Sequence, residues 1–105
     1  MFKVHIWLRK KEGMSAEEFQ RYWIEEHAPI ARDGYPALKG YVVNIVTRVP
    51  QGQEAPYDGV AELSWDSRED FSADMKSDAA ARGTEDLKTF TSGSGLLFIE
   101  QSQVK

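Results

Sequence analysis

The sequence predicts an α+β fold, in which a four-stranded antiparallel sheet carries two helices on one face. Three observations lead to this prediction. The chain opens on a segment that alternates between apolar and polar residues, a helix with a clear N-terminal cap follows, and strand-like and helix-like segments then recur. A chain of 105 residues has the length of one domain, and we expect residues 1–105 to form a single core.

The first nine residues are expected to form a strand. Phe2, Val4, Ile6 and Leu8 alternate with more polar residues, which is the period-two pattern of a strand with one apolar face. Trp7 belongs to the opposite face. A face in contact with water would not favour an exposed tryptophan, so we expect something to cover this side of the sheet.

The first helix is expected to begin at Ser15. Ser15 and Glu18 have the spacing of a capping box, in which the hydroxyl accepts a hydrogen bond from the third helical amide. The apolar residues that follow recur at helical spacing: Phe19, Tyr22, Trp23 and Ile30. Pro29 disfavours helical geometry in the residue before it and lacks an N–H group, so we expect the helix to end or kink there, next to His27.

Three further strands and one further helix are expected in the rest of the chain. The strands are predicted over residues 40–48, 57–65 and 96–99. Asp66 or Ser67 is expected to cap the second helix, which continues toward Gly83 and is followed by one more turn over residues 86–90. The segment Gly93-Ser94-Gly95 lacks the lysine and the following helix of a phosphate loop, and we interpret it as a flexible turn.

The resulting order, β-α-β-β-α-β, is the split βαβ or ferredoxin-like arrangement. Both helices lie on one face of such a sheet, and nothing within the chain covers the other face. Trp7 belongs to this uncovered face. We therefore predict a two-fold symmetric homodimer, in which a second copy covers it.

The bulk composition excludes several classes of function. The net charge is −4 and the basic residues are scattered, with Arg9-Lys10-Lys11 as the one tight run, so we expect no nucleic-acid binding. The chain has no cysteine, which excludes disulfides and thiol chemistry. No signal peptide or apolar run of membrane length is visible, and we expect a cytoplasmic protein without a membrane partner. Twelve aromatic residues can fill the core or line a pocket.

His27 is the strongest candidate for a catalytic residue. It lies near the expected helix end, on the flank of the aromatic stripe, where an imidazole can titrate near neutral pH and take or give a proton. The alternative is a structural role, in which the imidazole caps the last helix carbonyls. Glu25 and Glu26 precede it, but adjacent helical residues point about 100° apart and cannot converge on one atom. We interpret Glu25 as solvated and Glu26 as an alternative partner of His27.

The sequence contains no pattern of a metal site. His5 and His27 are the only histidines, and no pair of them or of His and Glu has metal-ligand spacing. A lone histidine can ligate haem iron, but nothing in the sequence specifically requires haem. We therefore expect no metal and no cofactor.

Four residues are candidates for substrate contact. Trp23 would supply an apolar wall of a pocket. Asn44 interrupts an apolar strand and needs a hydrogen-bond partner if it is buried. Tyr41 lies three residues earlier, on the other face of a regular strand, so the two belong to one pocket only if a bulge intervenes. Tyr57 opens the third strand together with Asp58 and Gly59, where turn chemistry is the alternative.

Taken together, these segments resemble the EthD-like family within the dimeric α+β barrel superfamily. The resemblance rests on the order and identity of five segments: Lys10 to Ser15, Phe19, Tyr22 to Pro29, Gly40 to Asn44, and Tyr57 to Trp65. It implies a ferredoxin-like protomer, a dimer through sheet faces, and a pocket between sheet and helices. The family's usual functional histidine maps onto His27. Lactone isomerases among the relatives also use a cysteine, which this chain lacks.

The leading hypothesis is a cofactor-independent enzyme that isomerises, oxidises or moves a proton on a cyclic or aromatic oxygenated compound. His27 would be its general acid or base. The alternative is a non-catalytic dimer that binds a small molecule and supports an oxygenase system.

Overall fold

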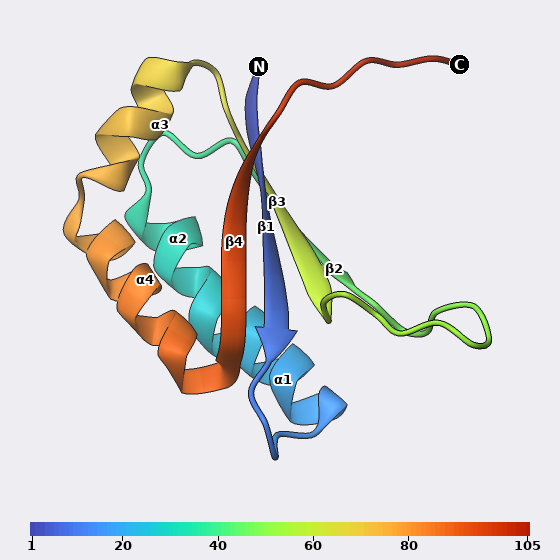
Figure 1. The fold of residues 1–105 in the computed structure, drawn as a ribbon. Coiled ribbons are helices and arrows are strands. Elements are labelled where there is room, and N and C mark those ends of the chain that lie inside the picture. Colours follow the sequence, from blue (N-terminus) through green and yellow to red (C-terminus); the bar gives the residue numbers. More distant parts are fainter.

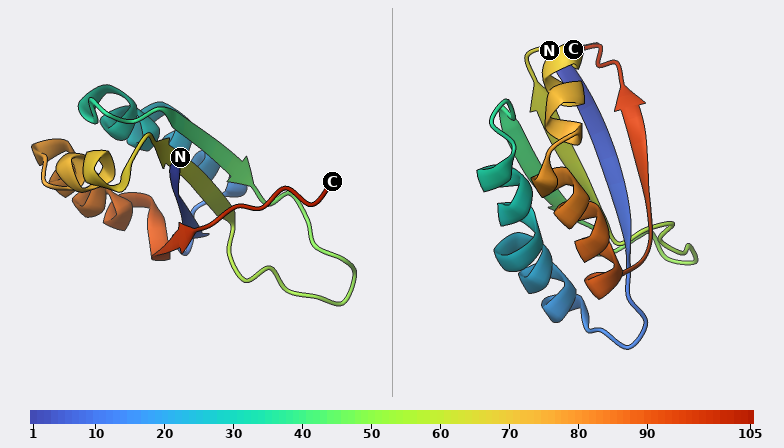
Figure 2. Two further views of the ribbon diagram at one scale, coloured as in Figure 1. Left: turned by 90° about the horizontal axis from the view of Figure 1, so that it is seen from above. Right: turned by 90° about the vertical axis from the view of Figure 1, so that its left-hand side faces the viewer.

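A four-stranded antiparallel sheet with the strand order β2–β3–β1–β4 forms the centre of the computed structural model, which describes residues 1–105. The strands are β1 (Phe2–Lys10), β2 (Gly40–Ile45), β3 (Gly59–Trp65) and β4 (Thr91–Ile99). The helical segments are α1 (Ala16–Tyr22), η1 (Trp23–His27), α2 (Ala28–Gly34), α3 (Arg68–Met75) and α4 (Asp78–Phe90). All of them lie on one face of the sheet (Figures 1 and 2). The predicted α+β, ferredoxin-like arrangement is confirmed.

The alternation predicted for β1 decides which face of the sheet is buried. Val4 pairs with Leu63 of β3 and with Phe98 of β4, and Ile6 pairs with Ala61 and Leu96, so these side chains share the helix-covered face. The fully buried core joins this face to the helices. Its members are Val4, Leu8, Phe19, Trp23, Ala61, Leu63, Trp65 and Phe90.

The sequence predicted that the first helix ends or kinks at Pro29. It does not end there but continues to Gly34, with an irregular turn just before the proline. Between α1 and α2 the chain forms a π-helical segment, in which the amide of Ala28 donates to the carbonyl of Trp23, five residues earlier. This wider turn lies directly before Pro29, whose ring would clash with the carbonyl four residues back in a regular α-helix. The cap at Ser15 is confirmed, since its hydroxyl accepts from the amide of Glu18 at 3.1 Å.

The C-terminal third of the chain also differs from the prediction. Ser67, one of the two predicted candidates, is the cap of α3. The predicted helix is not continuous, because α3 ends at Met75 and a second cap at Ser77 begins α4. Gly83 lies inside α4, which runs without a break to Phe90. The segment Gly93-Ser94-Gly95 is not a turn but part of β4. Its glycines are explained by Trp7 on the neighbouring strand: the indole lies across them so closely that a Cβ on Gly95 would come within 2.6 Å of its Cε2 atom.

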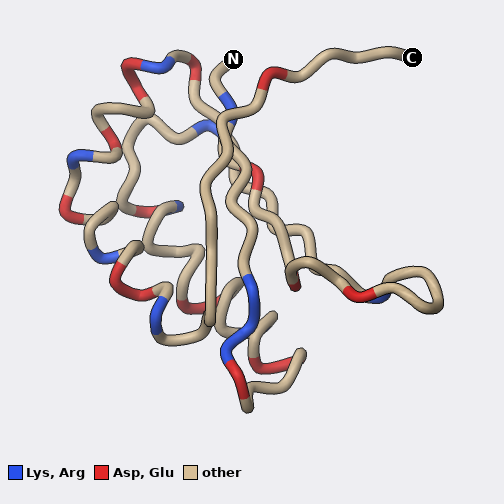
Figure 3. Tube along the Cα trace, viewed as in Figure 1, with Lys and Arg blue, Asp and Glu red and all other residues tan.

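The face of the sheet opposite the helices carries Trp7, as predicted, with Val42 and Leu97 exposed near it. The indole is only partly exposed, because the glycines of β4 lie under it and the guanidinium of Arg9 stacks 5.6 Å from its centre. Basic and acidic residues are interspersed along the trace, with one basic run at the end of β1 (Figure 3). None of the helices combines the length and the apolar character needed to cross a bilayer.

Candidate functional site

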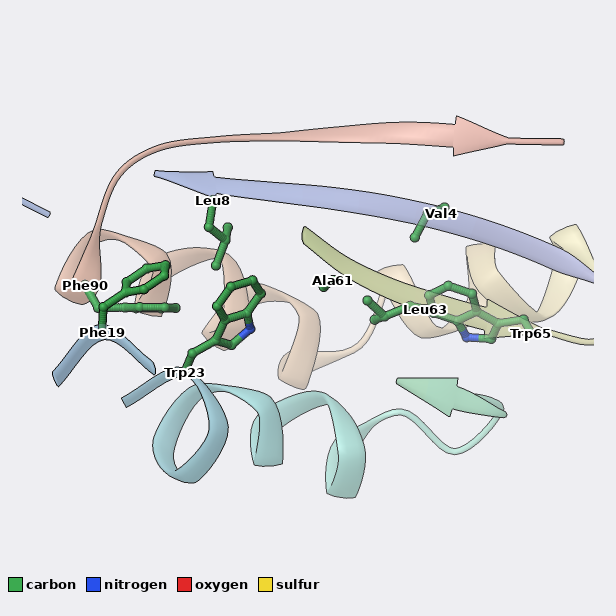
Figure 4. Close-up of a cluster of buried hydrophobic side chains, with 8 residues drawn as sticks. All are labelled: Val4, Leu8, Phe19, Trp23, Ala61, Leu63, Trp65 and Phe90. Atoms are coloured by element: carbon green, nitrogen blue, oxygen red, sulfur yellow. The ribbon is translucent and has the colours of Figure 1, made fainter. Parts of the chain in front are cut away.

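A cavity of about 220 Å³ lies between the sheet and the helices. Figure 4 shows the buried core as two groups, with Trp23, Phe19 and Phe90 at one end, Trp65 and Leu63 at the other, and the small Ala61 between them. Most of the lining is apolar, and the polar lining comes from a few side chains. These are His27, Tyr35, Tyr41, Thr84 and Ser94.

His27 lies at the last position of the π-helical segment and lines this cavity. Its side chain is 13% exposed, and its ring packs 4.9 Å from the centre of Phe90. Nδ1 lies 2.8 Å from Oδ2 of Asp86, whereas Nε2 has no hydrogen-bond partner within the chain. The imidazole therefore does not cap helix carbonyls, which was the alternative that the sequence left open for this residue.

Asp86 is the partner of His27 and was not among the candidates named from the sequence, nor were the lining residues Tyr35, Thr84 and Ser94. Asp86 lies on α4, where its Oδ1 accepts a hydrogen bond from the hydroxyl of Tyr22 at 2.8 Å and its Oδ2 is hydrogen-bonded to Nδ1 of His27 at 2.8 Å. The helical spacing could have indicated Asp86 as a site residue. It lies three residues after Gly83 and four before the buried Phe90, so it shares the side of α4 that packs inward. A carboxylate on an inward-facing helix side needs a partner.

Burial and Asp86 act on His27 in opposite directions. Burial disfavours the charged imidazolium and lowers the pKa of His27 below its usual value, while the hydrogen bond and the charge of Asp86 raise it. Burial is the larger of the two effects. The pKa of His27 is therefore lowered, and the imidazole is neutral at pH 7, which is the form able to accept a proton.

Tyr41 and Trp23, two of the four candidates for substrate contact, both line the cavity. The indole N–H of Trp23 donates to the hydroxyl oxygen of Tyr41 at 3.3 Å, so the hydroxyl proton of Tyr41 remains available to another acceptor. Burial raises the pKa of Tyr41 and keeps it protonated. Tyr35 lines the same cavity, and its hydroxyl has no hydrogen-bond partner within the chain.

The other two candidates for substrate contact lie outside the cavity. Asn44 is on the uncovered face of the sheet, where its amide donates to Glu62 at 2.9 Å and to the carbonyl of Val60 at 3.0 Å. No bulge interrupts β2, so Tyr41 and Asn44 point to opposite faces, and the face of Tyr41 lines the cavity. Tyr57 precedes β3 and does not line the cavity.

The acidic residues beside His27 do not take part in the site. Glu25 pairs with Arg21 on the surface, and Glu26 is exposed. No group of three or more His, Cys, Asp or Glu side chains is arranged to hold a metal ion. Proton transfer by His27 is the chemistry that this arrangement can support.

Comparison with known proteins identifies the family of this chain and structures with a similar fold. Residues 11–94 match the EthD domain family. An EthD family protein from Bacillus halodurans is similar in structure, with a TM-score of 0.79 and 22% identity over 97% of this chain and 100% of that one. No protein of curated function matches the sequence.

Two further structures show the same fold. An EthD-like protein from Ralstonia eutropha has a TM-score of 0.74 and 20% identity, over 99% of this chain and 94% of that one. A dimeric ferredoxin-like protein from Thermobifida fusca has a TM-score of 0.66 and 12% identity, over 95% of this chain and 90% of that one. At these identities the likeness concerns the fold.

Proposed function

Because this chain belongs to the EthD domain family, we propose that it is an enzyme that moves a proton on a small, apolar, cyclic or aromatic oxygenated compound, with His27 as its base. One observation carries the proposal: a largely buried histidine, hydrogen-bonded to a carboxylate, lines a mostly apolar cavity. Burial lowers the pKa of His27, which favours the neutral form that can accept a proton. Such a step needs only a base and a donor to the developing oxyanion, and hence no cofactor.

The chemistry proposed is the removal of a proton from a carbon next to a carbonyl group. Nε2 of His27 accepts the proton, and the electron pair of the broken C–H bond moves to the carbonyl oxygen to form an enolate. The hydroxyl of Tyr41 donates a hydrogen bond to this oxygen. Where the substrate has a C=C bond at its β and γ carbons, the enolate is conjugated. Return of the proton from His27 to the γ carbon then moves the double bond into conjugation with the carbonyl group, which gives an isomer and restores the neutral base.

The volume of the cavity limits the size of the substrate. A cavity of about 150 Å³ in another protein accommodates benzene. By simple proportion, a cavity of about 220 Å³ has room for about nine non-hydrogen atoms, which is one ring with a few substituents. The proposed substrates are therefore single-ring ketones, enones and lactones with a C–H bond next to the carbonyl group, rather than fused three-ring compounds.

We also propose that the protein is a homodimer formed through the uncovered face of the sheet. Val42 and Leu97 are each 52% exposed on this face, with Trp7 between their strands. Such a group of apolar side chains on a flat sheet is typical of an interface. The fold is shared with a protein described as dimeric, which supports the same arrangement.

Exchange of substrate protons with deuterium tests the assignment of His27 without knowledge of the product. Single-ring ketones, enones and lactones are incubated with the protein in D₂O, and loss of the α-proton signal is followed by NMR. We expect His27→Ala to slow the exchange about 10²–10⁴-fold. His5→Ala is the matched control, because His5 lies on the opposite face of the sheet beside Glu62.

Equal exchange rates in the two variants would refute the role of His27. A second result would redirect the proposal: tight binding of single-ring compounds without any exchange or conversion would favour the non-catalytic binding protein. Binding is measured by calorimetry on the same compounds, so that the two outcomes are separated by one set of samples.

A further inference from the structure

We propose that Asp86 is the positioning residue of the site: it holds His27 in the tautomer that carries its proton on Nδ1, and so presents Nε2 as the proton acceptor. The inference deepens the proposed function, since it rests on His27 as the base. It concerns a residue on a different element, 59 positions further along the chain.

The geometry leaves little freedom to the imidazole. The contact between Nδ1 and Oδ2 of Asp86 is 2.8 Å, and Phe90 packs against the ring at 4.9 Å. An ionised carboxylate only accepts hydrogen bonds, so the proton of the pair belongs to Nδ1. A neutral imidazole carries one proton, which leaves a lone pair on Nε2.

Asp86 is itself held by Tyr22. The hydroxyl of Tyr22 donates to Oδ1 at 2.8 Å, whereas His27 contacts Oδ2, so both carboxylate oxygens are held. The side chain of Asp86 is 20% exposed and also lines a shallow polar groove on the surface with Arg82 and Lys88. Asp86 thus lies between the enclosed imidazole and the solvent, where it can stabilise the imidazolium that forms when Nε2 takes a proton.

Asp86 is the only charged group in contact with His27. Glu26, the neighbour in sequence, is exposed, and the hydroxyl of Tyr22 is hydrogen-bonded to Asp86 rather than to His27. Replacing Asp86 therefore removes the influence that raises the pKa of His27 and leaves burial, which lowers it. Asn can also donate its amide proton to Nδ1, which would transfer the imidazole proton to Nε2 and block the acceptor.

The experiment compares the full-length wild type with Asp86→Asn by two-bond ¹H–¹⁵N NMR of the histidine side chains, as a function of pH. The chain has two histidines, and a His5→Gln variant assigns their signals. In the wild type we expect neutral His27 to carry its proton on Nδ1. In Asp86→Asn we expect the proton to shift toward Nε2 and the pKa of His27 to fall.

The matched control is Glu85→Gln, which removes the same charge from a side chain that is 75% exposed and pairs with Lys88. We expect it to change neither the tautomer nor the pKa of His27. Turnover provides the second readout. Asp86→Asn should lower kcat at least tenfold with little effect on KM. The same substitution of the aspartate that orients the catalytic histidine of a serine protease lowers kcat about 10⁴-fold. Glu85→Gln should leave kcat unchanged.

An Nε2–H tautomer in the wild type would overturn the inference, and this result stands even if Asp86→Asn fails to fold. An unchanged tautomer and pKa in a folded Asp86→Asn variant would overturn it as well. The two proposals can fail separately. Full turnover in His27→Ala would refute the role of His27 as the base. An Nε2–H tautomer in the wild type, together with an inactive His27→Ala variant, would refute only the role of Asp86.

Discussion

Gly83→Ala should stabilise the protein while it narrows the cavity. Gly83 lies in the interior of α4 without a positive φ, so alanine can adopt its conformation. A Cβ there would lie 3.7 Å from the hydroxyl oxygen of Tyr35 and 3.9 Å from Cγ2 of Ile30, which are ordinary contacts. Both neighbours line the cavity, and no atom has to move.

The gain follows from the helix position. Glycine in a helix interior costs roughly 0.5–1 kcal/mol relative to alanine. For a domain of this size, the substitution should raise Tm by about 2–8 °C. The added methyl group occupies space that we assign to the substrate, so single-ring ligands should bind more weakly to the more stable variant.

Thermal unfolding followed by circular dichroism measures the first effect, and calorimetric titration measures the second. Ala81→Gly is the control, because Ala81 is exposed on the same helix, and its loss of stability calibrates the helix propensity of α4. A lower Tm for Gly83→Ala, beside the expected loss for Ala81→Gly, would refute the reasoning, because it would mean that the space beside Gly83 is not free.

Three further outcomes are expected. Gly95→Ala should lower the free energy of unfolding, measured with urea, by about 1–3 kcal/mol, because its methyl group would collide with Trp7. Gly93→Ala should be tolerated, since its Cβ would lie 3.8 Å from the indole. Equal losses of stability in the two variants would contradict this packing. Folding lowers the pKa of His27, so as the pH falls the unfolded state takes up this proton at a higher pH than the folded state. The free energy of unfolding should therefore decrease below about pH 6.5, and more steeply in the wild type than in His27→Asn. Leu97→Asp should shift the protein toward its 11.9 kDa monomer in sedimentation, and a persistent dimer would place the interface elsewhere.

The fold could be predicted from the sequence because its signals are local. The alternation from Phe2 to Leu8 sets the buried face of β1, and the hydroxyls of Ser15 and Ser67 mark the helix starts that the structure shows. The errors came from glycine and proline, whose effects depend on what packs beside them. From the sequence Gly95 indicates a turn, whereas in the structure it lies in a strand and its missing side chain makes room for the indole of Trp7.

The candidate site was predictable only in part. His27, Trp23 and Tyr41 could be named because an aromatic stripe and the family resemblance point to them, and they do meet in one cavity. Asp86 could not be named, because its contact with His27 joins α4 to η1, and a sequence shows no such distance directly. Asn44 was named as a candidate because it interrupts an apolar strand, but the sequence does not show which face of the sheet such a residue occupies. In the structure it lies on the uncovered face and is hydrogen-bonded to Glu62.

The π-helical segment explains why His27 faces the cavity. Phe19, Trp23, His27 and Ala31 are spaced by four residues, and each is buried or half-buried. In a regular α-helix a step of four residues overshoots a full turn by about 40°, so three such steps would carry the last residue about 120° around the helix. The wider turn from Trp23 to Ala28 removes part of this drift and keeps His27 and Ala31 on the side facing the sheet. π-helical turns of this kind are frequently found at functional sites, and here the turn places the imidazole where it reaches both the cavity and Asp86.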